Sequence, residues 1–485
     1  MSASVERLRD ARILVVNWRD VCHPLAGGAE QYMHEIGRRW VRAGAAVTWL
    51  AAAVPGRPTQ ERLDGMRVLR AGGPLSVYAR TAVRLLQTRG HFDAVVDCQN
   101  GIPFYAPLFA GAEMPVVQVV HHVHQDQFAT RFSAPMAAVG RLMEGPLACR
   151  VYADRPIAAV SPSTRSELRR RLGFTGPVYV VPNGTVLPAR VDGRRTTAPT
   201  VVLVSRLVPH KRIDLLLGHL ATIATRIPGL RVEVAGDGPD RSRLQGLAAD
   251  LGLQSTVRFH GRVPDEVRDL LLEHAWLTVS TSAAEGWGCS VIEAAAWGVP
   301  CLALEAPGIR DSVLDQETGW LVEQPADLGS ALVAAIGQLA DSERARVMAR
   351  ACRDWAACFS WDRSADLLAG VVLQEMGRVA ARRRSRELNR RSARSDMAVV
   401  ARVRDVDADV VPTALRVTDE VVGDGDLTSV VLTGCDEFDA PAVLDRIGAR
   451  VLSLRLVDRR QLLAGPTVSR PPLADATDVG TRGST

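Results

Sequence analysis

The 485-residue sequence predicts an α/β protein in which two tandem, doubly wound parallel-sheet domains face a cleft. Three observations support this fold. Short β-branched runs alternate with longer helical patterns, as they do in βαβ units. The alternation stops once, at the proline-containing stretch 187–199, and then restarts. Small or polar residues follow several of the strands, at the sheet edge where α/β proteins bind ligands.

The first domain is expected over residues 1–186, with six strands and two clear helical patterns. The strands are predicted at Arg12–Asn17, Ala46–Ala51, Ala94–Asp97, Val116–Val120, Ile157–Val160 and Val178–Val181, and the helices at Gln31–Arg42 and Pro162–Leu172. Asn17, Asp97, His121 and Ser161 stand at strand ends. The carboxyl edge of this sheet is therefore predicted to be polar.

Residues 187–199 are expected to form a linker, and residues 200–360 a second domain of the same kind. Its strands are predicted at Thr200–Ser205, Arg231–Ala235, Val257–His260, Leu277–Ser280 and Pro300–Ala303, and its helices near Arg212–Arg226, Pro239–Asp250, Asp265–Glu273 and Ser290–Trp297. Helical patterns continue through 361–380.

The last hundred residues differ in composition. Residues 381–396 are expected to form an Arg-rich linker, 397–466 a small α/β extension of unknown role, and 467–485 a disordered tail. Within the extension, three Val-rich segments predict strands, and helical patterns lie near Pro412–Val422 and Asp439–Ile447.

Charge and cysteine usage exclude several classes of protein. The net charge is +5, but Arg378–Arg394 alone carries +7, which leaves −2 for the rest and argues against a nucleic-acid-binding surface. No apolar run is long enough to span a bilayer, and the N-terminus lacks the apolar core of a secretory signal. The eight cysteines are scattered without a C-x-x-C pair. We therefore expect a cytoplasmic protein with reduced thiols.

The strongest local signal is the segment Glu285–Glu293, which follows the apolar strand LTVSTS. A strand, a glycine-containing turn and a helix direct backbone N–H groups towards a phosphate, and Gly286 and Gly288 allow close approach of a ligand. A capping box of Ser290 and Glu293 is the structural alternative. It does not account for Glu285 in the turn.

A second signal places two cations around a short turn. Arg206 and Lys211 lie at the end of the second domain's first strand, and Lys211 is the single lysine among 59 basic residues. A guanidinium fork and an ammonium can converge on one anion. The alternative is the chance placement of two solvated cations at a helix start.

Two further motifs are weaker. Gly27-Gly28-Ala29-Glu30 opens the first long helix but lacks the G-x-G-x-x-G spacing of dinucleotide sites. His121-His122-Val-His124 follows a strand, but no Cys or Asp clusters beside it, so we expect no metal site. His121 is predicted to line the strand-end edge, and the D-x-D pattern of Asp405–Asp409 lies far from it in the extension.

Taken in series, these motifs resemble glycosyltransferase family 4, the retaining enzymes of the GT-B fold. The matching segments, in the family's order over roughly residues 10–380, are GGAE, the strand before His121, VSPST (160–164), VPNG (181–184), SRLVPHK (205–211), AGDGP (235–239), FHGRV (259–263) and the E-x7-E of 285–293. The segment HHVHQDQF resembles an actinobacterial subgroup. The resemblance implies that the first domain binds the acceptor, that the second binds the sugar nucleotide, and that helices over 361–380 cross back.

The resemblance also implies a role for each matching residue. Arg206 and Lys211 would hold the diphosphate, Glu285 the sugar hydroxyls, and Glu293 the ribose. The remaining donor contacts would come from Gly28, His121 near the reacting carbon, the backbone at Arg262–Val263 for the base, and the turn residues Gly286, Trp287, Gly288, Cys289 and Ser290. Two positions depart from the family: Arg212 replaces the usual Gly after the lysine, and Trp287 a smaller or Phe side chain.

The resulting expectation is a metal-independent, retaining transfer of a sugar from a nucleotide-diphosphate sugar, without a cofactor. A UDP-sugar is favoured over a GDP-sugar, and the acceptor is an unidentified small molecule or lipid-linked group. Fixed cations would stabilise charge on the leaving diphosphate. A sugar-nucleotide epimerase of the same fold and a non-enzymatic sugar-nucleotide-binding scaffold are the alternatives. Arg378–Arg394 would be either a solvated helical spacer or a peripheral contact with the inner membrane face.

Overall fold

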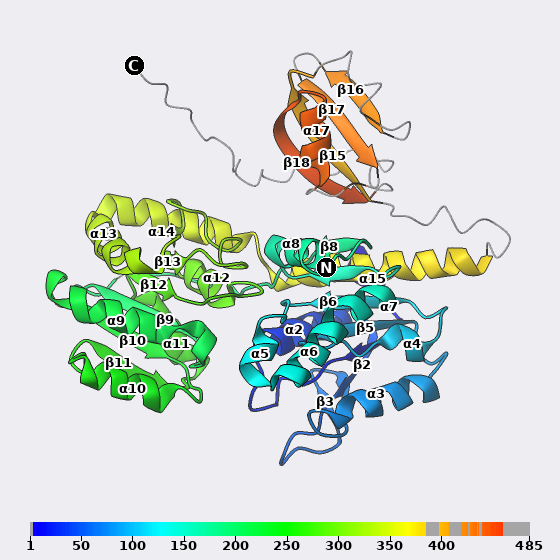
Figure 1. Cartoon of the computed structure of the whole chain (residues 1–485), viewed down its shortest axis with the longest axis horizontal. Helices are drawn as coiled ribbons and strands as arrows, with labels where there is room; N and C mark the ends of the chain where they lie inside the picture. Colours follow the sequence, from blue (N-terminus) through cyan, green and yellow to red (C-terminus); the bar gives the residue numbers. More distant parts are fainter. Residues whose placement is uncertain are drawn as a thin grey trace. The chain divides into compact units, whose positions relative to one another are not determined.

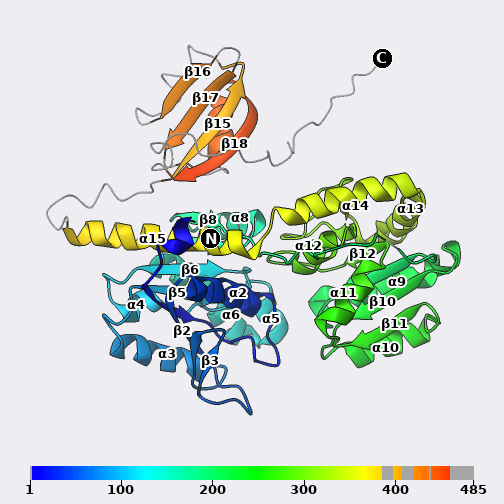
Figure 2. The same ribbon diagram turned by 180° about the vertical axis from the view of Figure 1, so that it is seen from behind.

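The computed structural model describes residues 3–193, 195–384, 397–406, 415, 419–424, 427–433, 435 and 439–458. The chain divides into two compact units, Met1–Arg384 and Ser385–Thr485. The first unit contains two sheets in separate lobes (Figures 1 and 2), which we call the N-terminal lobe (residues 3–186) and the C-terminal lobe (residues 200–357).

The N-terminal lobe is built on an eight-stranded sheet whose pairs are parallel except for β3 with β4. Its strands, in spatial order, are β3 (Gln60–Leu63), β4 (Met66–Arg70), β2 (Ala46–Ala51), β1 (Arg12–Val16), β5 (Ala94–Gln99), β6 (Val116–Val120), β7 (Ile157–Ala159) and β8 (Val178–Val180). Every residue of β5, β6 and β7 is buried, as expected for parallel strands covered on both faces.

Helices cover both faces of this sheet (Figures 1 and 2). They are α1 (Ala3–Glu6), α2 (Gly28–Arg42), α3 (Ser76–Gln87), α4 (Ala106–Ala110), α5 (Gln127–Arg131), α6 (Ala134–Leu142), the π-helix η1 (Met143–Leu147), α7 (Ala148–Val151) and α8 (Pro162–Arg170). Tyr32, Ile36 and Trp40 lie one turn apart on α2 and are fully buried. This apolar stripe fixes which side of α2 packs against the core.

The C-terminal lobe has a six-stranded, wholly parallel sheet. Its strands, in spatial order, are β11 (Val257–Gly261), β10 (Arg231–Ala235), β9 (Thr200–Val204), β12 (Leu277–Ser280), β13 (Cys301–Leu304) and β14 (Gly319–Val322). The helical elements are η2 (Pro209–Lys211), α9 (Ile213–Ile223), η3 (Ala224–Arg226), α10 (Arg241–Asp250), α11 (Asp265–Glu273), α12 (Cys289–Ala296), η4 (Pro325–Asp327), α13 (Leu328–Ala340) and α14 (Ser342–Ala357).

A single helix, α15 (Trp361–Arg384), returns from the C-terminal lobe to the N-terminal lobe (Figures 1 and 2). It packs against α1, α2 and β6. Trp40 Nε1 donates a hydrogen bond of 3.0 Å to Ala365 O, and Arg155 Nη1 lies 2.8 Å from Oε1 of the buried Glu375. These contacts explain why segments far apart in the sequence belong to one unit.

The second unit contains a four-stranded antiparallel sheet and one described helix. Its elements are β15 (Met397–Arg404), β16 (Glu420–Asp424), β17 (Leu427–Thr433), α17 (Asp439–Arg446) and β18 (Arg450–Asp458). The helix predicted over Pro412–Val422 is wrong at its end, because Glu420, Val421 and Val422 belong to β16 and pair with β17. Asp407, Asp409, most of the Arg-rich segment 381–396 and the tail 467–485 lie outside the described residues.

No helix in the described ranges is long and apolar enough to cross a bilayer.

Candidate active site between the two lobes

The ion pair between Lys211 and Glu285 lies at the carboxyl edge of the C-terminal sheet. Lys211 Nζ contacts Glu285 Oε1, and both side chains are more than four-fifths buried, with exposures of 16% and 18%. Ser282 Oγ donates to the same carboxylate oxygen at 2.7 Å, and Thr281 Oγ1 donates to Lys211 O at 2.7 Å. The two sequence-predicted residues, 74 positions apart, therefore meet and are held by neighbouring side chains.

Arg206 approaches the same region from the end of β9. Its side chain is exposed, and a methyl group placed on Gly27 of the other lobe would lie 3.7 Å from its guanidinium carbon. A methyl group on Gly28 would lie 3.4 Å from Cys289 Sγ, at the start of α12. The two glycines at the opening of α2 thus face Arg206 and the start of α12.

Gly286 allows backbone to approach backbone, and Gly288 allows the turn to approach the side chain of Ser312. A methyl group on Gly286 would lie 1.8 Å from His121 O in the N-terminal lobe, and one on Gly288 would lie 2.3 Å from Ser312 Oγ. Real Cβ atoms do not adopt such distances, so the backbone contact at Gly286 requires glycine, and a side chain at position 288 would have to displace Ser312. The turn before α12 therefore touches the end of β6 directly.

Further contacts join the lobes beside this turn. Thr164 Oγ1 lies 3.4 Å from Gly286 O, and Ser163 N donates to Asp311 Oδ2 at 2.8 Å. Both residues belong to the first turn of α8, which Ser161 caps by accepting from Thr164 N at 2.9 Å. The VSPST segment thus acts as a contact between lobes, a role that the sequence alone did not indicate.

The start of α12 excludes the capping-box hypothesis. The helix begins at Cys289 with Gly288 as its N-cap, so Ser290 occupies the second helical position and makes no side-chain cap. Glu293 makes no hydrogen bond to another described residue. Burial raises its pKa to about 7, although the nearby Arg268 acts in the opposite direction. A carboxylate in this condition is a candidate for binding hydroxyl groups.

Trp287 and Val263, two of the expected donor-binding residues, lie in different environments. The Trp287 side chain is 7% exposed and packs edge-on against Phe359, with ring centroids 4.9 Å apart, so only its backbone lies in the turn. Val263 follows β11 and is partly buried. Its loop is connected to the Arg206 loop through Gly236, whose N–H donates to Gly261 O at 2.7 Å and whose Cα faces Ser205 O.

His121 is buried at the end of β6, with its ring edge-on to Tyr32 at a centroid distance of 5.0 Å. Burial, with a smaller effect from His124, lowers its pKa to about 3. Its Nε2 is buried and has no hydrogen-bond partner among the described residues. The imidazole is therefore neutral near pH 7, and one of its nitrogens is buried without a partner among the described residues.

The other two histidines of the motif do not complete a metal site with it. The rings of His122 and His124 meet edge-on at 5.1 Å, whereas His121 turns to Tyr32. Across the described part of the chain, His, Cys, Asp and Glu side chains form no cluster of three suited to a metal ion.

Two polar networks at the N-terminal strand ends were missed by sequence reasoning. In the first, Glu30 is 1% exposed and accepts hydrogen bonds from Gly27 N at 2.7 Å, Arg19 Nε at 3.1 Å and Asn100 Nδ2 at 3.2 Å. Asn100 also donates to Asn17 Oδ1 at 3.0 Å. The polar strand end at Asn17 was the available signal, but its partners come from distant segments.

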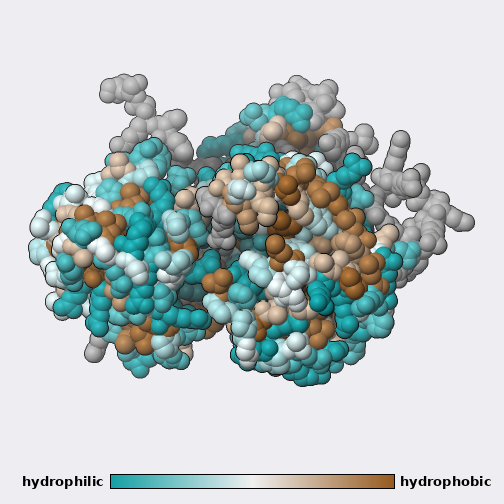
Figure 3. Space-filling view, turned by 60° about the horizontal axis from the view of Figure 1, so that its bottom comes forward, coloured by the Kyte–Doolittle hydropathy of each residue, from teal (hydrophilic) through white to brown (hydrophobic). Residues whose placement is uncertain are grey.

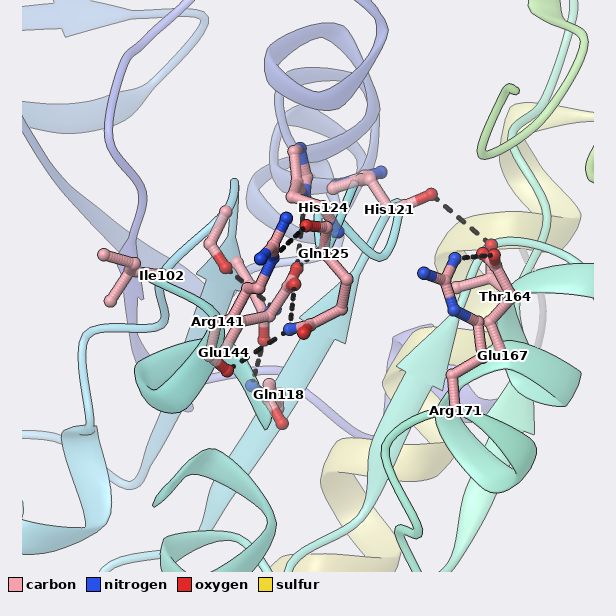
Figure 4. A network of polar contacts seen from close by, with 12 residues as sticks. Ile102, Gln118, His121, His124, Gln125, Arg141, Glu144, Thr164, Glu167 and Arg171 are labelled. Atoms are coloured by element: carbon pink, nitrogen blue, oxygen red, sulfur yellow. Dashed lines mark hydrogen bonds and ion pairs between the residues drawn. The ribbon is translucent and has the colours of Figure 1, made fainter. Parts of the chain in front are cut away.

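The second network centres on Glu144, which is fully buried in the π-helix η1 (Figure 4). Its carboxylate accepts from His124 N at 2.6 Å and Gln125 Nε2 at 2.8 Å, and it lies 3.3 Å from His124 Nδ1. Gln99 Nε2 approaches it at 3.4 Å. Because it accepts hydrogen bonds from His124 N and Gln125 Nε2, this carboxylate fixes the loop that follows His121. Single-turn π-helices are frequent at functional sites.

Two family models match successive stretches of the chain. The model described as Glycosyltransferase Family 4 matches residues 26–187, and the one described as Glycosyl transferases group 1 matches residues 189–355. Their boundary falls between the two lobes. The chain belongs to glycosyltransferase family 4.

Relatives of this glycosyltransferase include two actinobacterial enzymes, as the motif pattern predicted. The GDP-mannose-dependent alpha-(1-6)-phosphatidylinositol monomannoside mannosyltransferase of Mycolicibacterium smegmatis is 34% identical over 276 residues, which cover 54% of this chain and 63% of the relative. The chain thus matches less than two thirds of that relative's length. The D-inositol 3-phosphate glycosyltransferase of Geodermatophilus obscurus is 29% identical over 403 residues, covering 73% and 86%.

Solved structures show the same GT-B fold. Sucrose-phosphate synthase from Thermosynechococcus elongatus has a TM-score of 0.61 at 21% identity, covering 78% of this glycosyltransferase and all of the other chain. WaaG, a glycosyltransferase involved in lipopolysaccharide biosynthesis, has a TM-score of 0.59 at 16% identity, covering 74% and 99%. At these identities the likeness concerns the fold alone.

Proposed function

We propose that the protein transfers a sugar, with retention of configuration, from a nucleoside diphosphate sugar to a hydroxyl group of an acceptor, without a metal ion. The observation that carries this proposal is the approach of Arg206 to Gly27 of the other lobe, together with the pairing of Lys211 with Glu285 at the same sheet edge. Two cations beside a glycine-lined turn match the diphosphate of such a donor.

The donor's binding would rearrange the Lys211–Glu285 pair. Lys211 Nζ turns to a phosphate oxygen, and the Glu285 carboxylate accepts hydrogen bonds from sugar hydroxyls. Because Ser282 Oγ holds the same carboxylate oxygen as Lys211 does, Glu285 keeps its orientation when the ammonium moves. An internal ion pair of this kind keeps both groups compensated before the donor arrives.

The sugar-transfer step then requires stabilisation of the charge on the leaving diphosphate more than it requires proton transfer by a side chain. The bond from the anomeric carbon to the diphosphate oxygen breaks, and a bond from that carbon to the acceptor oxygen forms on the same face. The acceptor's proton passes to the leaving phosphate oxygen. Arg206 and Lys211 bind the growing negative charge more strongly than the ground state, which lowers the barrier.

His121 would orient the sugar rather than exchange protons. A pKa of about 3 leaves its ring neutral, so Nε2 would form one hydrogen bond with a hydroxyl near the reacting carbon. Glu293, one turn into α12, would accept the ribose hydroxyls. The backbone at Arg262–Val263 would contact the base.

For the acceptor, we propose an inositol-containing group carried by a lipid. The names of both relatives support an inositol, and one of them names a phosphatidylinositol glycoside. GDP and UDP are both candidates for the donor nucleotide. GDP-mannose is named in one relative, and a solved neighbour of the same fold was crystallised with UDP.

The test is calorimetric titration of the full chain with UDP, GDP and ADP, followed by assays of nucleoside diphosphate release with and without an inositol phospholipid glycoside. The proposal predicts release only with acceptor, and an α-linked product from an α-linked donor. Release or sugar isomerisation without acceptor would indicate the epimerase alternative, and binding without any turnover would indicate the scaffold. Activity should survive EDTA; loss that Mg²⁺ or Mn²⁺ restores would contradict the metal-free mechanism.

A further inference from the structure

The sheet of the second unit has two different faces. β17 and β18 both pair antiparallel with β15 and are joined by α17, an arrangement that places this helix over one face of the sheet (Figure 1). That face holds the core, where buried side chains of the strands and the helix pack together: Val399, Ala401, Val403, Val430, Leu432 and Leu444. Successive residues of a strand point to opposite faces, so the residues between these on β15 and β17 belong to the other face.

Four exposed arginines gather on that other face. Arg402 and Arg404 alternate with the buried residues of β15, and Arg455 alternates on β18 with leucines that pack against the core. Arg450 stands directly opposite Arg404 in the register of β18 with β15, so these two residues share a face. We call Arg402, Arg404, Arg450 and Arg455 the arginine face.

The arginine face carries no acids of its own. None of its four guanidinium groups forms an ion pair or a hydrogen bond with another residue that the structure describes. β15 and β17 contain no Asp or Glu, and β16, which carries Glu420 and Asp424, is separated from β15 by β17. Like charges directly opposite each other, as at Arg404 and Arg450, destabilise a sheet. An anionic partner would offset this repulsion.

Acids are abundant elsewhere in the second unit. From Met397 onwards the sequence has 14 Asp and Glu against 10 Arg. The positive charge of the arginine face therefore does not follow from a basic composition. It results from the placement of arginines on one face of the sheet.

Exposed arginines of the first unit have acidic neighbours. Figure 3 shows that hydrophilic residues cover much of both lobes. Arg243 lies 2.7 Å from a carboxylate oxygen of Asp240, and Arg346 lies 2.6 Å from one of Glu343, although both arginine side chains are more than half exposed. Exposure alone therefore does not leave an arginine of this protein unpaired. Four arginines that share one face without an acid indicate a site for an anionic partner.

The arginines stand in rows that repeat along the two strands. Arg404 and Arg450 form the first row, Arg402 the second, and Arg455, which is opposite Val400, the third. Successive rows on a strand are two residues apart, which is roughly 6.5–7 Å. Alternate residues of an extended peptide have the same separation. A peptide with an acidic residue at every second position would therefore place one carboxylate at each row.

Other residues of this face favour a peptide over a nucleic acid or a phosphate polymer. Val400 and Val431 are cross-strand neighbours on the arginine face and are half-buried, so apolar surface lies beside the guanidinium groups. The CH₂ groups of acidic side chains can pack there, whereas polyphosphate has no such group. The four strands contain no Phe, Tyr or Trp on which a base could stack.

We propose that the arginine face of the second unit binds an extended segment of a partner protein in which every second residue is acidic. Each carboxylate accepts hydrogen bonds from the guanidinium groups of one row, and the residues between the acids point away from the sheet. The proposal concerns an interaction surface outside the two lobes that form the candidate active site. It is independent of the sugar transfer proposed above.

The experiment measures fluorescence anisotropy of labelled peptides titrated with the full-length protein. The test peptide alternates Glu and Ser, and the control peptide has the same number of Glu residues placed at every third position. The test variant replaces all four residues of the arginine face by glutamine. Its matched control removes the same charge from exposed arginines of the first unit, again by glutamine, at Arg80, Arg84, Arg231 and Arg258.

The wild type and the first-unit control should bind the alternating peptide equally, whereas the arginine-face variant should bind it at least about tenfold more weakly. Binding by the wild type should weaken as salt is added. The wild type should also bind the control peptide more weakly, because acids at every third position alternate between the two sides of an extended chain. A double variant, Arg402→Gln with Arg455→Gln, should show an intermediate loss. Circular dichroism of both variants should match the wild type, which separates lost binding from lost fold.

Equal binding of the alternating peptide by the wild type and the arginine-face variant would overturn the proposal, as would an absence of wild-type binding. Equal affinity of the wild type for the two peptides would reject the match between the rows and an extended chain. Tighter binding of inorganic polyphosphate or of oligouridylate than of the alternating peptide would assign the face to those polyanions instead. A wild-type dimer that becomes monomeric in the arginine-face variant, measured by light scattering, would assign it to a second copy of the chain.

Discussion

The two lobes present opposite kinds of polar surface at the site that they share. On the C-terminal side, Arg206 is exposed and Glu293 has no hydrogen-bond partner among the described residues, so charged groups there remain available to a ligand. On the N-terminal side, Glu30 and Glu144 are each satisfied by three or more neighbours. On the proposed function, we therefore expect the C-terminal lobe to bind its ligand by charge, and the N-terminal lobe to bind by the shape and hydrogen bonds of a fixed, internally compensated surface.

The largest expected effect comes from removing the ammonium group of Lys211 in the C-terminal lobe. Lys211→Ala should lower turnover by roughly 10²–10³, because one preorganised charge-assisted donor to the leaving diphosphate is lost. Lys211→Arg should recover part of that loss, since a planar fork cannot occupy the position of an ammonium. Steady-state kinetics of nucleoside diphosphate release measures both. Turnover above half of wild type in the alanine variant would remove Lys211 from the site.

The contact between the lobes can be broken at Gly286. Gly286→Ala would place a methyl group 1.8 Å from His121 O, so the turn must withdraw from the N-terminal lobe. A displacement of about 1 Å at the reacting groups is enough to lower kcat by about 10². Gly337→Ala, on α13 with open space around it, is the matched control and should leave kcat unchanged. Equal kinetics of both variants would show that the lobes need not touch here.

The third prediction uses the pKa of Glu293. The ribose hydroxyls donate to the ionised carboxylate, and a pKa of about 7 means that most of this group is protonated at pH 6 and ionised at pH 8. The affinity for UDP-glucose or GDP-mannose should therefore rise by about tenfold from pH 6 to pH 8. Glu293→Gln should bind more weakly at pH 8 and lose this dependence. An unchanged pH profile in the variant would assign the titration to another group.

The smallest effect concerns a departure from the family pattern. Arg212 follows Lys211 with a φ of +51°, in the left-handed region where glycine is favoured, and this explains why glycine is the family's usual residue. Arg212→Gly should stabilise the fold by up to about 1 kcal/mol, measured by denaturant unfolding. Arg226→Gly, at a position without positive φ, should destabilise it. A loss of stability in Arg212→Gly would show that the arginine side chain contributes more than its backbone costs.

Sequence reasoning predicted the site residues of the C-terminal lobe better than the polar networks of the N-terminal lobe, and the reason is physical. Lys211 and Glu285 sit in short motifs beside buried strands, so the topology of a parallel sheet brings them to one edge. Glu144 meets His124 only through the π-helix η1, a geometry that periodicity does not encode. Likewise, the partners of Asn17 lie in separate segments.

The secondary structure shows the same contrast between elements that the sequence predicts and elements that it does not. The buried strands were predicted because continuous apolar runs between turns indicate them. The β3–β4 hairpin was missed because its strands carry Gln60, Glu61, Arg62 and Arg67, and because it lies at the sheet's edge, where one side faces solvent. Positions whose environment is set by distant contacts therefore required the structure.

The central claim, that the C-terminal lobe alone supplies the charge that binds the donor, is tested most directly by calorimetric titration of UDP and GDP into three full-length proteins. These are the wild type, Lys211→Ala and the N-terminal-lobe variant Asn100→Ala. We predict that one of the two nucleotides binds the wild type and Asn100→Ala equally and binds Lys211→Ala at least about tenfold more weakly. Equal weakening in both variants, or full affinity in Lys211→Ala, would contradict the claim.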